Sequence, residues 1–204
     1  MSGQPVIDRK TRRRQETTDE ILAASWAIVG EKGLAGLSMR DLGDRVGMRA
    51  QSLYSYFASK HEIYDAMFAA GYRQALATMD EVANGPEADP FERMRLGNRR
   101  FFEFCISDRA RYQLLFQRTI PDFEPSSAAY EISTELYGVM QKGLRAIGVD
   151  EPAQHDLWTA VMTGLADQQL SNDPGGDRWA RLVDEATDML FDHLSPGWRD
   201  RSET

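Results

Sequence analysis

The stretch SMRDLGDRVGMRAQSLYSYFASKHE, residues 38–62, predicts two short helices joined by a tight turn and followed by the start of a third helix. Leu42 and Val46 give the first helix an apolar stripe, because residues four apart share one face of a helix. Gly47 follows at the position where a left-handed helix cap favours a residue without a Cβ. The stretch therefore predicts a helix-turn-helix unit.

The second helix of this unit has one buried stripe and one polar surface. Leu53 and Phe57, four residues apart, form the stripe. The residues left on or near the outer surface are Arg49, Ala50, Gln51, Ser52, Ser55 and Tyr56. A short helix whose outward side is small, polar and aromatic, without an acid, suits insertion into the major groove of DNA.

Several separately spaced residues extend the pattern beyond the two helices. They are Glu31-Lys32-Gly33, Leu37-Ser38-Met39-Arg40-Asp41-Leu42, Gly47, Leu53-Tyr54-Ser55-Tyr56-Phe57 and Lys60. Together they resemble the N-terminal domain of TetR/AcrR-type regulators over roughly residues 15–68. This chain departs from the family at Arg49, where the family often has Ser or Thr, and at Ala50-Gln51, where it often has Lys-Gly. The preference for particular bases is therefore not carried over.

The resemblance implies two kinds of DNA contact. Backbone contacts are carried to Ser38, Arg40, Tyr54, Tyr56 and Lys60, and base-reading roles to Arg49, Ala50, Gln51 and Ser52. Ser38 and Lys60 also lie at predicted helix N-termini, where free N–H groups and the helix dipole attract phosphate. The alternative for any one of these residues is a plain helix cap or surface side chain.

Residues 1–16 are polar and rich in basic residues, which predicts an arm that is disordered in isolation. The basic residues are Arg9, Lys10, Arg12, Arg13 and Arg14. We expect the arm, with Arg12, to lie along the DNA backbone or in the minor groove, whose narrow negative channel favours arginine. The alternative is a tail that only keeps the protein in solution.

Three capping signals divide the part of the chain that follows. A hydroxyl residue precedes an acid by three positions at Thr17 and Glu20, at Ser38 and Asp41, and at Ser59 and Glu62. In a capping box of this kind the hydroxyl and the carboxylate satisfy backbone N–H groups at the start of a helix. We therefore expect the first helix to begin at Thr17, and Gly33 to end it.

The rest of the chain predicts a larger helical body, so the expected fold is all-α with about nine helices. Body helices are expected at residues 60–82, 90–107, 108–118, 128–147 and 153–171 and from Trp179 to Leu194. The helix at 128–147 is apolar on two sides and is expected to be central. The predicted domains are the arm at 1–16, the DNA-binding domain at 17–60 with its helix-turn-helix at 38–57, and an effector-binding and dimerisation domain at 61–204.

Composition and charge bound the class of protein. The net charge is −8, but residues 1–60 hold 10 Lys and Arg against 7 Asp and Glu, whereas residues 61–204 hold 14 against 25. A basic N-terminal part on an acidic body fits a local DNA contact. Cys105 is the only cysteine, so no disulfide forms within the chain. Without a signal peptide or an 18-residue apolar run, we expect a cytoplasmic protein with no membrane partner.

Two further features of the body concern its partners. The last two helices are apolar over wide arcs, and the resemblance implies that they pair with those of a second subunit in a homodimer; the alternative is that these arcs belong to the core of a monomer. Aromatic and apolar residues, with a few polar ones, are candidates for lining an effector pocket, and the alternative for each is ordinary core packing. They are Asn98, Phe101, Phe102, Tyr112, Gln113, Phe116, Tyr137, Trp158, Met162 and Gln168. Asn98 lies on an apolar stripe and needs a partner, either a ligand group or the backbone of another helix.

The sequence lacks the residue patterns of catalysis and metal binding. His61, His155 and His193 are far apart, with no carboxylate or cysteine at ligand spacing. The pair His155-Asp156 has no nucleophile in a recognisable context, so we expect no enzymatic activity, no metal and no cofactor. The predicted function is a ligand-responsive transcriptional regulator, with repression expected, that binds a palindromic operator and is released by a small apolar or aromatic effector. The alternative is a helical ligand-binding or protein-interaction module without DNA-binding function.

Overall fold

The computed structural model describes residues 8–202. Within them the chain forms ten α-helices and two 3-10 helices, so the prediction of an all-α fold with about nine helices is confirmed. The elements are α1 (Arg9–Lys32), η1 (Leu34–Gly36), α2 (Met39–Arg45), α3 (Ala50–Leu53), α4 (Lys60–Ala83), α5 (Pro90–Ser107), α6 (Arg109–Phe116), α7 (Ser127–Ala146), α8 (Pro152–Asn172), η2 (Ala180–Leu182), α9 (Val183–Leu194) and α10 (Trp198–Ser202). No helix among these residues is both long and apolar enough to span a bilayer.

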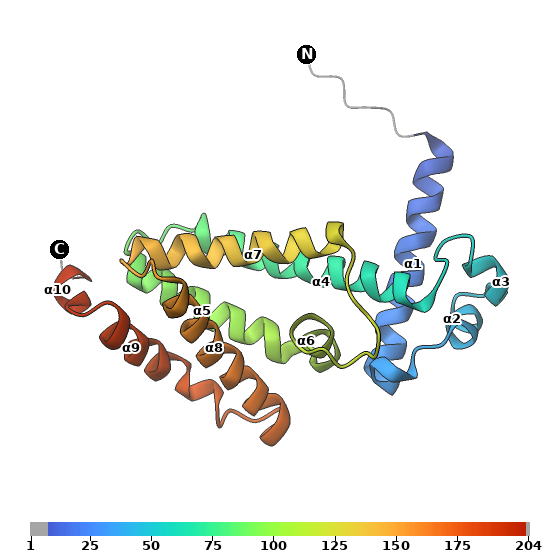
Figure 1. Ribbon diagram of the computed structural model, residues 1–204. Coiled ribbons are helices and arrows are strands. Elements are labelled where there is room, and N and C mark those ends of the chain that lie inside the picture. Colours follow the sequence, from blue (N-terminus) through green and yellow to red (C-terminus); the bar gives the residue numbers. More distant parts are fainter. Residues whose placement is uncertain (1–7, 203–204) are drawn as a thin grey trace, which may run out of the picture.

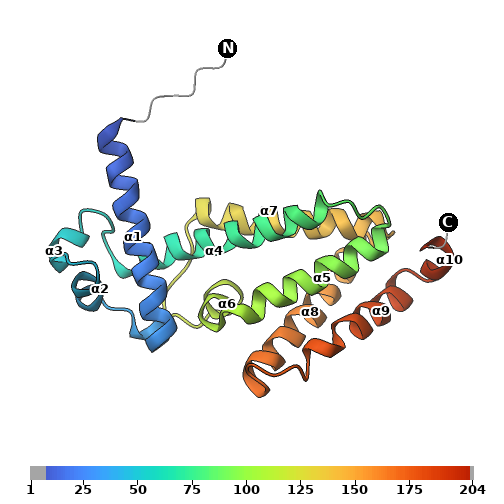
Figure 2. The same cartoon turned by 180° about the vertical axis from the view of Figure 1, so that it is seen from behind.

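The helices form a small head and a larger body, joined by the long helix α4 (Figure 1). The head consists of α1, α2 and α3 and lies at the end of the molecule opposite α10. In the body, α4 and α7 pack side by side, α5 lies beneath them, and α8 and α9 pack against the other side of α5 (Figure 2). The first turns of α1 project beyond the other two head helices (Figures 1 and 2).

Helix α1 begins eight residues earlier than predicted. It starts at Arg9 after Asp8, and the hydroxyl of Thr17 donates to the Arg13 carbonyl oxygen at 3.1 Å inside the helix. The capping box at Thr17 is therefore wrong, because Arg, Lys, Gln and Glu are good helix formers and extend a helix that already exists. Residues 9–16 of the predicted arm are helical in the folded chain, whereas the predicted disorder concerned the arm in isolation. Residues 1–7 of the predicted arm lie outside the described residues.

The other helix signals are confirmed. The Oγ atoms of Ser38 and Ser59 accept the N–H groups three residues on, at 3.1 and 3.2 Å. The carboxylate of Glu62 reaches back to the Ala58 N–H at 2.7 Å, one residue before the position expected for a capping box. Gly33 ends α1 with a φ of 74°, a conformation that favours glycine.

The head has its own apolar core, which continues into α4. Its innermost side chains are at most 1% exposed and are Ile21, Ile28, Leu42, Leu53 and Ile63. The hydroxyl of Tyr64, on α4, donates to the Leu34 carbonyl oxygen in the head. Because the buried Tyr64 side chain has a satisfied hydroxyl, it fastens the first turns of α4 to the head.

Helix α4 presents one close contact to α6. Ile63 and Met67, in its first half, are buried, whereas Ala77, near its other end, is exposed. A Cβ at Gly71 would lie 3.0 Å from the side chain of Leu115 on α6. The missing side chain at Gly71 is therefore what lets these two helices approach so closely.

Helix α7 lies at the surface, and the prediction that it is central is wrong. Ala129, Leu136 and Leu144 are buried against the rest of the body, where α7 packs mainly on α4. Tyr130 is 60% exposed and Tyr137 is 37% exposed. A tyrosine tolerates exposure because its ring carries a polar hydroxyl, so the second apolar side of α7 faces water.

A buried polar network joins α5, α8 and α9. The Asn98 side-chain amide donates to Thr187 Oγ1 at 2.9 Å, and the Trp158 indole N–H donates to Asn98 Oδ1 at 3.1 Å. The partners of Asn98 are therefore side chains, and the helix-backbone partner given as one alternative is wrong. With its oxygen and its amide both bonded, Asn98 lies in an apolar core without an unpaired polar group.

Ion pairs continue the seam between α5 and α9. Arg99 binds Asp184 through two hydrogen bonds of 2.6 and 2.7 Å, and Arg95 pairs with Asp188. The hydrogen bond from Arg99 lowers the pKa of the Asp184 carboxyl. These pairs align the cations of α5 with the acids of α9.

The last predicted helix is divided in the structure. The buried amide of Gln169 accepts the N–H groups of Trp179 and Ala180 at 2.9 and 3.1 Å, and the chain then forms η2 before α9 begins at Val183. The prediction that one helix begins near Trp179 is therefore wrong by four residues. The short helix α10 was not predicted, because five residues carry too little apolar periodicity.

Candidate nucleic-acid interface

Two glycines build the turn between α2 and α3. Gly47 has a φ of 66°, in agreement with the predicted left-handed cap. A Cβ at Gly43 would lie 2.7 Å from the Met48 carbonyl oxygen, and the Met48 N–H donates to the Gly43 carbonyl at 2.9 Å. Gly43 was not among the predicted turn residues, although a glycine inside a helical pattern is a signal for a close approach of two backbones.

Helix α3 is shorter than the predicted second helix. It follows Arg49, whose backbone is extended, and ends at Leu53. Leu53 is fully buried and Phe57 is 6% exposed, as the apolar stripe predicted. Residues 54–56 form a turn, although the Phe57 N–H still donates to the Leu53 carbonyl at 2.9 Å.

The base-reading candidates lie at the start of α3. Arg49, Gln51 and Ser52 are exposed, and Ala50 is half-buried. Within residues 8–202 the Arg49 side chain has no hydrogen bond or ion pair to another residue. No acidic residue occurs from 46 to 61, so no carboxylate of this segment would repel phosphate.

The backbone-contact candidates lie at the ends of three helices. Ser38 caps α2, and Arg40 is exposed in its first turn. Tyr54, in the turn after α3, is 52% exposed. Lys60 begins α4, and its Nζ lies 5.6 Å from the centre of the Tyr64 ring. Helix N-termini and exposed hydroxyl and ammonium groups are the groups that hold phosphate.

A contact that the sequence analysis missed joins α1 to the turn after α3. Arg14 Nη2 donates to the Ser55 carbonyl oxygen at 2.7 Å, and its guanidinium carbon lies 4.9 Å from the centre of the Tyr56 ring. Arg12, the predicted contact of the arm, is exposed on the same helix and lies 3.7 Å from Glu16. The basic segment is therefore a helix attached to the α2–α3 unit, residues 38–57, which we call the reading unit.

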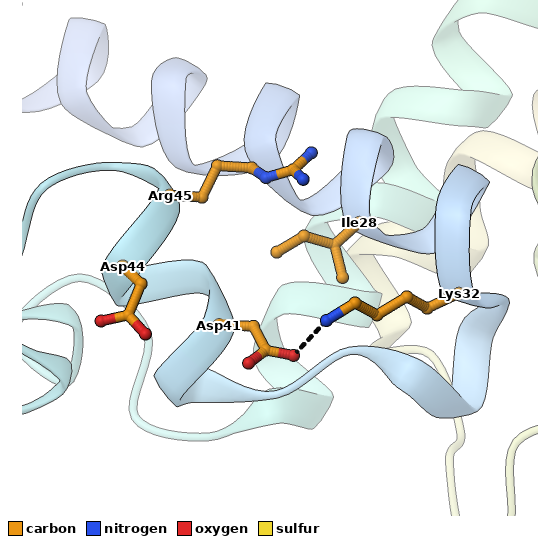
Figure 3. A pocket seen from close by; sticks show the side chains of 5 residues that line it. All are labelled: Ile28, Lys32, Asp41, Asp44 and Arg45. Carbon is orange, nitrogen blue, oxygen red and sulfur yellow. Dashed lines mark hydrogen bonds and ion pairs between the residues drawn. The ribbon is translucent and has the colours of Figure 1, made fainter.

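Two acids of the head, Asp41 and Glu31, are paired with basic residues on the α1–α2 side. A shallow hollow of about 320 Å³ between these helices is lined by Ile28, Lys32, Asp41, Asp44 and Arg45 (Figure 3). Lys32 lies 2.7 Å from Asp41, and Arg45 makes two hydrogen bonds of 2.9 and 2.7 Å to Glu31. These hydrogen bonds lower the pKa values of Asp41 and Glu31. Lys32 and Arg45 thus neutralise acids within the head.

Three of the effector candidates come together in the body. The ring centres of Phe101 and Phe116 lie 5.6 Å apart, and those of Tyr112 and Phe116 lie 5.4 Å apart. The Tyr112 hydroxyl donates to the Thr163 carbonyl at 3.0 Å, and burial raises the pKa of this hydroxyl. The rings of α5 and α6 therefore pack on one another and are joined to α8.

The other candidates lie in several places. Phe102, Trp158 and Met162 are at most 2% exposed in the core, where Asn98, which is 6% exposed, is hydrogen-bonded to Trp158. Gln113 is half-buried on α6, Tyr137 lies on the outer side of α7, and Gln168 is exposed on α8. The ten candidates thus belong to several places in the body.

An apolar surface lies between α8 and α9. It is hollowed to about 500 Å³ and lined by Ala160, Val161, Gly164, Leu165, Gln168, Leu182, Glu185, Ala186 and Met189. Met189, on α9, is 55% exposed, and Leu157, one turn before Val161 on α8, is 41% exposed. We call this surface the α8–α9 face. Large apolar side chains gathered on an exposed surface mark a site of association.

Other candidate chemistry is absent from the described part of the chain. No group of three or more His, Cys, Asp or Glu side chains within residues 8–202 is placed to hold a metal ion. His155 is buried, with Nε2 3.0 Å from the Val149 carbonyl oxygen, so it holds a loop. Cys105 is buried, which raises the pKa of its thiol and makes it unreactive.

Comparison with known proteins places this geometry among bacterial regulators. Residues 21–67 match the model of the family described as bacterial regulatory proteins, tetR family. The transcriptional activator FasR of Mycolicibacterium smegmatis is 28% identical over 129 residues, covering 60% of this chain and 55% of FasR. The transcriptional repressor KstR2 of Mycobacterium tuberculosis is 29% identical over 89 residues, covering 44% of each chain. The chain thus matches about half the length of each relative.

Solved structures of low sequence identity share the whole fold. The regulatory protein SCO4313 has a TM-score of 0.75 and 21% identity, over 90% of this chain and 98% of that one. The transcriptional regulator FadR from Bacillus subtilis, solved in complex with stearoyl-CoA, has a TM-score of 0.63 and 16% identity, over 87% of this chain and 98% of that one. At such identity the likeness concerns the fold alone.

Proposed function

The chain belongs to the TetR family of helix-turn-helix transcriptional regulators, and we propose that it binds a palindromic DNA operator as a homodimer. The observation that carries this proposal is the α2–α3 unit, residues 38–57, which exposes Arg49, Gln51 and Ser52 in a segment, residues 46–61, that contains no acid. The family consists of regulatory proteins and not of enzymes, so no residue is assigned a catalytic role.

The proposed DNA contacts divide by their task. Phosphate contacts, which supply affinity and salt dependence, are assigned to Arg12, Ser38, Arg40, Tyr54, Tyr56 and Lys60. Base contacts, which supply specificity, are assigned to Arg49, Ala50, Gln51 and Ser52. We place the DNA-binding domain at residues 17–60, the basic segment before it, and the effector-binding and dimerisation domain at 61–204.

The α8–α9 face is the proposed dimer interface. Its exposed Met189 and Leu157 and its apolar hollow support association with an equal surface of a second copy. A two-fold axis through this face places two reading helices in successive major grooves, about 34–36 Å apart. The operator is then a near-palindrome with half-sites one helical turn apart.

We propose repression that is relieved by a small apolar effector bound in the body. FasR is named an activator and KstR2 a repressor, so family membership leaves the direction of control open. FadR was solved with stearoyl-CoA, which supports a long acyl group as the first effector class to examine. Phe101, Tyr112 and Phe116 pack closely, so an effector must separate these rings and favour a conformation that binds DNA less well.

The test begins with selection of duplexes from random sequence, followed by titration of the purified protein at several salt concentrations. A palindromic site bound by a dimer, with affinity falling steeply as salt rises, is the expected result. Failure to enrich any sequence, with weak binding even at low salt, would favour the alternative of a helical ligand-binding or protein-interaction module.

Variants then test the assigned contacts. Replacing Tyr56 and Lys60 together with Ala should weaken binding to every sequence, and loss of the Lys60 charge should reduce the salt slope by about one. Lys142→Ala removes an exposed lysine of α7 in the body and serves as the control that leaves binding unchanged. Equal affinity of the double variant and the wild type would refute these two contacts.

A release assay tests the effector. Stearoyl-CoA added to the protein–operator complex should free the DNA, and shortening the acyl chain should weaken the effect as apolar area is lost. Coenzyme A without the acyl group is the matched control. Release by coenzyme A alone, or equal release by acyl chains of every length, would contradict an apolar site.

A further inference from the structure

Arg14 makes two contacts with the reading unit, although it lies 41 residues before Ser55, the first of its two partners. Its Nη2 donates to the Ser55 carbonyl oxygen at 2.7 Å, and its guanidinium carbon lies 4.9 Å from the centre of the Tyr56 ring. Figure 1 shows the first half of α1 passing beside the segment that connects α3 to α4. The two contacts link successive residues of that segment to one side chain.

The segment needs such an outside contact. Helix α3 has only four residues, so its own hydrogen bonds do little to fix the turn that follows. The carbonyl groups at the end of a helix lack partners within the helix, and an arginine near them satisfies the acceptor and suits the negative end of the dipole. Arg14 supplies this partner at Ser55.

The ring of Tyr56 is held from two sides. It is half-buried and packs against the apolar core of the head, while the guanidinium of Arg14 lies over it. Tyr54, two residues before, is 52% exposed and has no ring or cation contact within the described residues. Of these two tyrosines, Tyr56 is therefore the one whose hydroxyl has a defined direction.

We infer that Arg14 is a positioning residue, which holds the turn at Ser55 and the ring of Tyr56 so that the Tyr56 hydroxyl meets a DNA phosphate. This inference rests on the proposed function, because it gives Arg14 a role through a proposed phosphate contact. It differs from the role of Arg12, which is assigned a phosphate contact of its own. One of the donor groups of Arg14 is already used within the head.

The first experiment measures operator affinity and its salt slope for Arg14→Ala, Tyr56→Phe and the double variant. Arg14→Ala should weaken binding about five-fold, the effect of one lost hydrogen bond. Its salt slope should stay that of the wild type, since no phosphate charge pair is lost. In the Tyr56→Phe background, Arg14→Ala should have no further effect, because the hydroxyl that it positions is already absent.

The matched control is Arg13→Ala. Arg13 is exposed on the same helix, carries the same charge, and has no contact with Ser55 or Tyr56. Whatever its size, the effect of Arg13→Ala on affinity should be the same in the wild-type and Tyr56→Phe backgrounds. If the effect of Arg14→Ala on affinity is also the same in both backgrounds, and the substitution lowers the salt slope by about one, then Arg14 binds phosphate directly and the inference is overturned.

The second experiment uses the protein without DNA. In NMR spectra of protein with ¹³C-labelled tyrosine rings, the Tyr56 signal is assigned by its loss in Tyr56→Phe. The chemical shift of this signal should change in Arg14→Ala and stay unchanged in Arg13→Ala. An unmoved signal overturns the positioning role even if operator binding is normal. A moved signal together with a wild-type protein that binds no operator retains the contact and refutes the proposed function.

Discussion

Two glycines of the head have different backbone conformations, although an added Cβ at either would meet nothing within 4 Å. Gly47 has a φ of 66°, whereas Gly30 lies in the last turns of the regular helix α1. In the left-handed region the Cβ of an L-residue is sterically unfavourable. In a helix, by contrast, glycine is unfavourable because it loses more backbone entropy on folding than alanine does. The same substitution should therefore act in opposite directions at the two positions.

We expect Gly47→Ala to lower the free energy of unfolding by about 1 kcal/mol and Gly30→Ala to raise it by about 0.5–1 kcal/mol. Urea unfolding of both variants at one protein concentration measures the difference, since a dimer makes the apparent stability depend on concentration. Equal shifts of the same sign would show that the conformation at Gly47 carries no strain for alanine.

The Arg99–Asp184 pair gives a pH dependence whose sign follows from its pKa. Arg99 lowers the pKa of Asp184 in the folded protein below the ordinary 3.8, so the stabilisation is present above that value and is lost as the pH falls through the lowered pKa. Both side chains are nearly half exposed, so we expect the pair to contribute only about 0.5 kcal/mol to the free energy of unfolding. Asp184→Asn should be less stable than the wild type at pH 7, and the difference should shrink below about pH 4.

Urea unfolding of the wild type and Asp184→Asn from pH 7 to pH 3 checks this dependence. Asp156→Asn is the matched control, because Asp156 is exposed on α8 and has no ion pair within residues 8–202. Its stability should follow that of the wild type across the range. A constant difference between wild type and Asp184→Asn at all pH values would mean that the carboxylate charge contributes nothing.

At the scale of elements, short-range signals predicted the structure well and long-range packing did not follow from them. Ser38, Ser59 and Gly33 mark helix ends through groups within three or four residues, and the structure confirms each. The surface position of α7 depends on what packs against it, which its own periodicity does not specify. The start of α1 was missed because Thr17 fits a cap equally well in sequence, while the residues before it simply continue the helix.

The candidate site shows the same division. The residues of α2 and α3 are close in sequence, so their spacing predicted which of them are exposed. Arg14 reaches Ser55 across 41 residues, and no local pattern indicates that contact. The effector candidates were chosen for ring content, which does not distinguish a ring in the core, such as Trp158, from one at the surface, such as Tyr137.

The contact between α4 and α6 yields a prediction for two elements. Leu115→Ala should cost about 3 kcal/mol through the cavity it leaves. In the wild type, Gly71→Ala should lower the free energy of unfolding by roughly 1 kcal/mol, since its Cβ would lie 3.0 Å from Leu115. In the Leu115→Ala background the same substitution should raise it by about 1 kcal/mol, because only the higher helix propensity of alanine remains. Unfolding of the four proteins gives the coupling energy, and additive effects would refute the close contact.

At the scale of the whole molecule, the α8–α9 face predicts the oligomeric state. Met189→Asp places a charge at the centre of the proposed interface, and two-fold symmetry places it there twice. If each buried charge reduces the free energy of association by about 2 kcal/mol, the dissociation constant of the dimer should rise roughly a thousand-fold. Sedimentation at micromolar concentration should find dimers for the wild type and monomers for the variant.

Tyr130→Asp is the control for this measurement. Tyr130 is 60% exposed on α7, so the substitution removes a comparably exposed apolar side chain outside the α8–α9 face. This variant should remain a dimer. A monomeric Tyr130→Asp together with a dimeric Met189→Asp would move the interface to α7.

The positions of α1 and α10 have a practical consequence for handling the protein. The first turns of α1 lie in the head, next to the proposed DNA contacts, and α10 lies at the far end of the body (Figure 1). A purification tag or fluorophore fused before α1 would sit beside the bound duplex and disturb both affinity and salt dependence. One fused after α10 would be remote from the DNA, so C-terminal fusions are the suitable reagents for immobilisation and for fluorescence readouts of operator release.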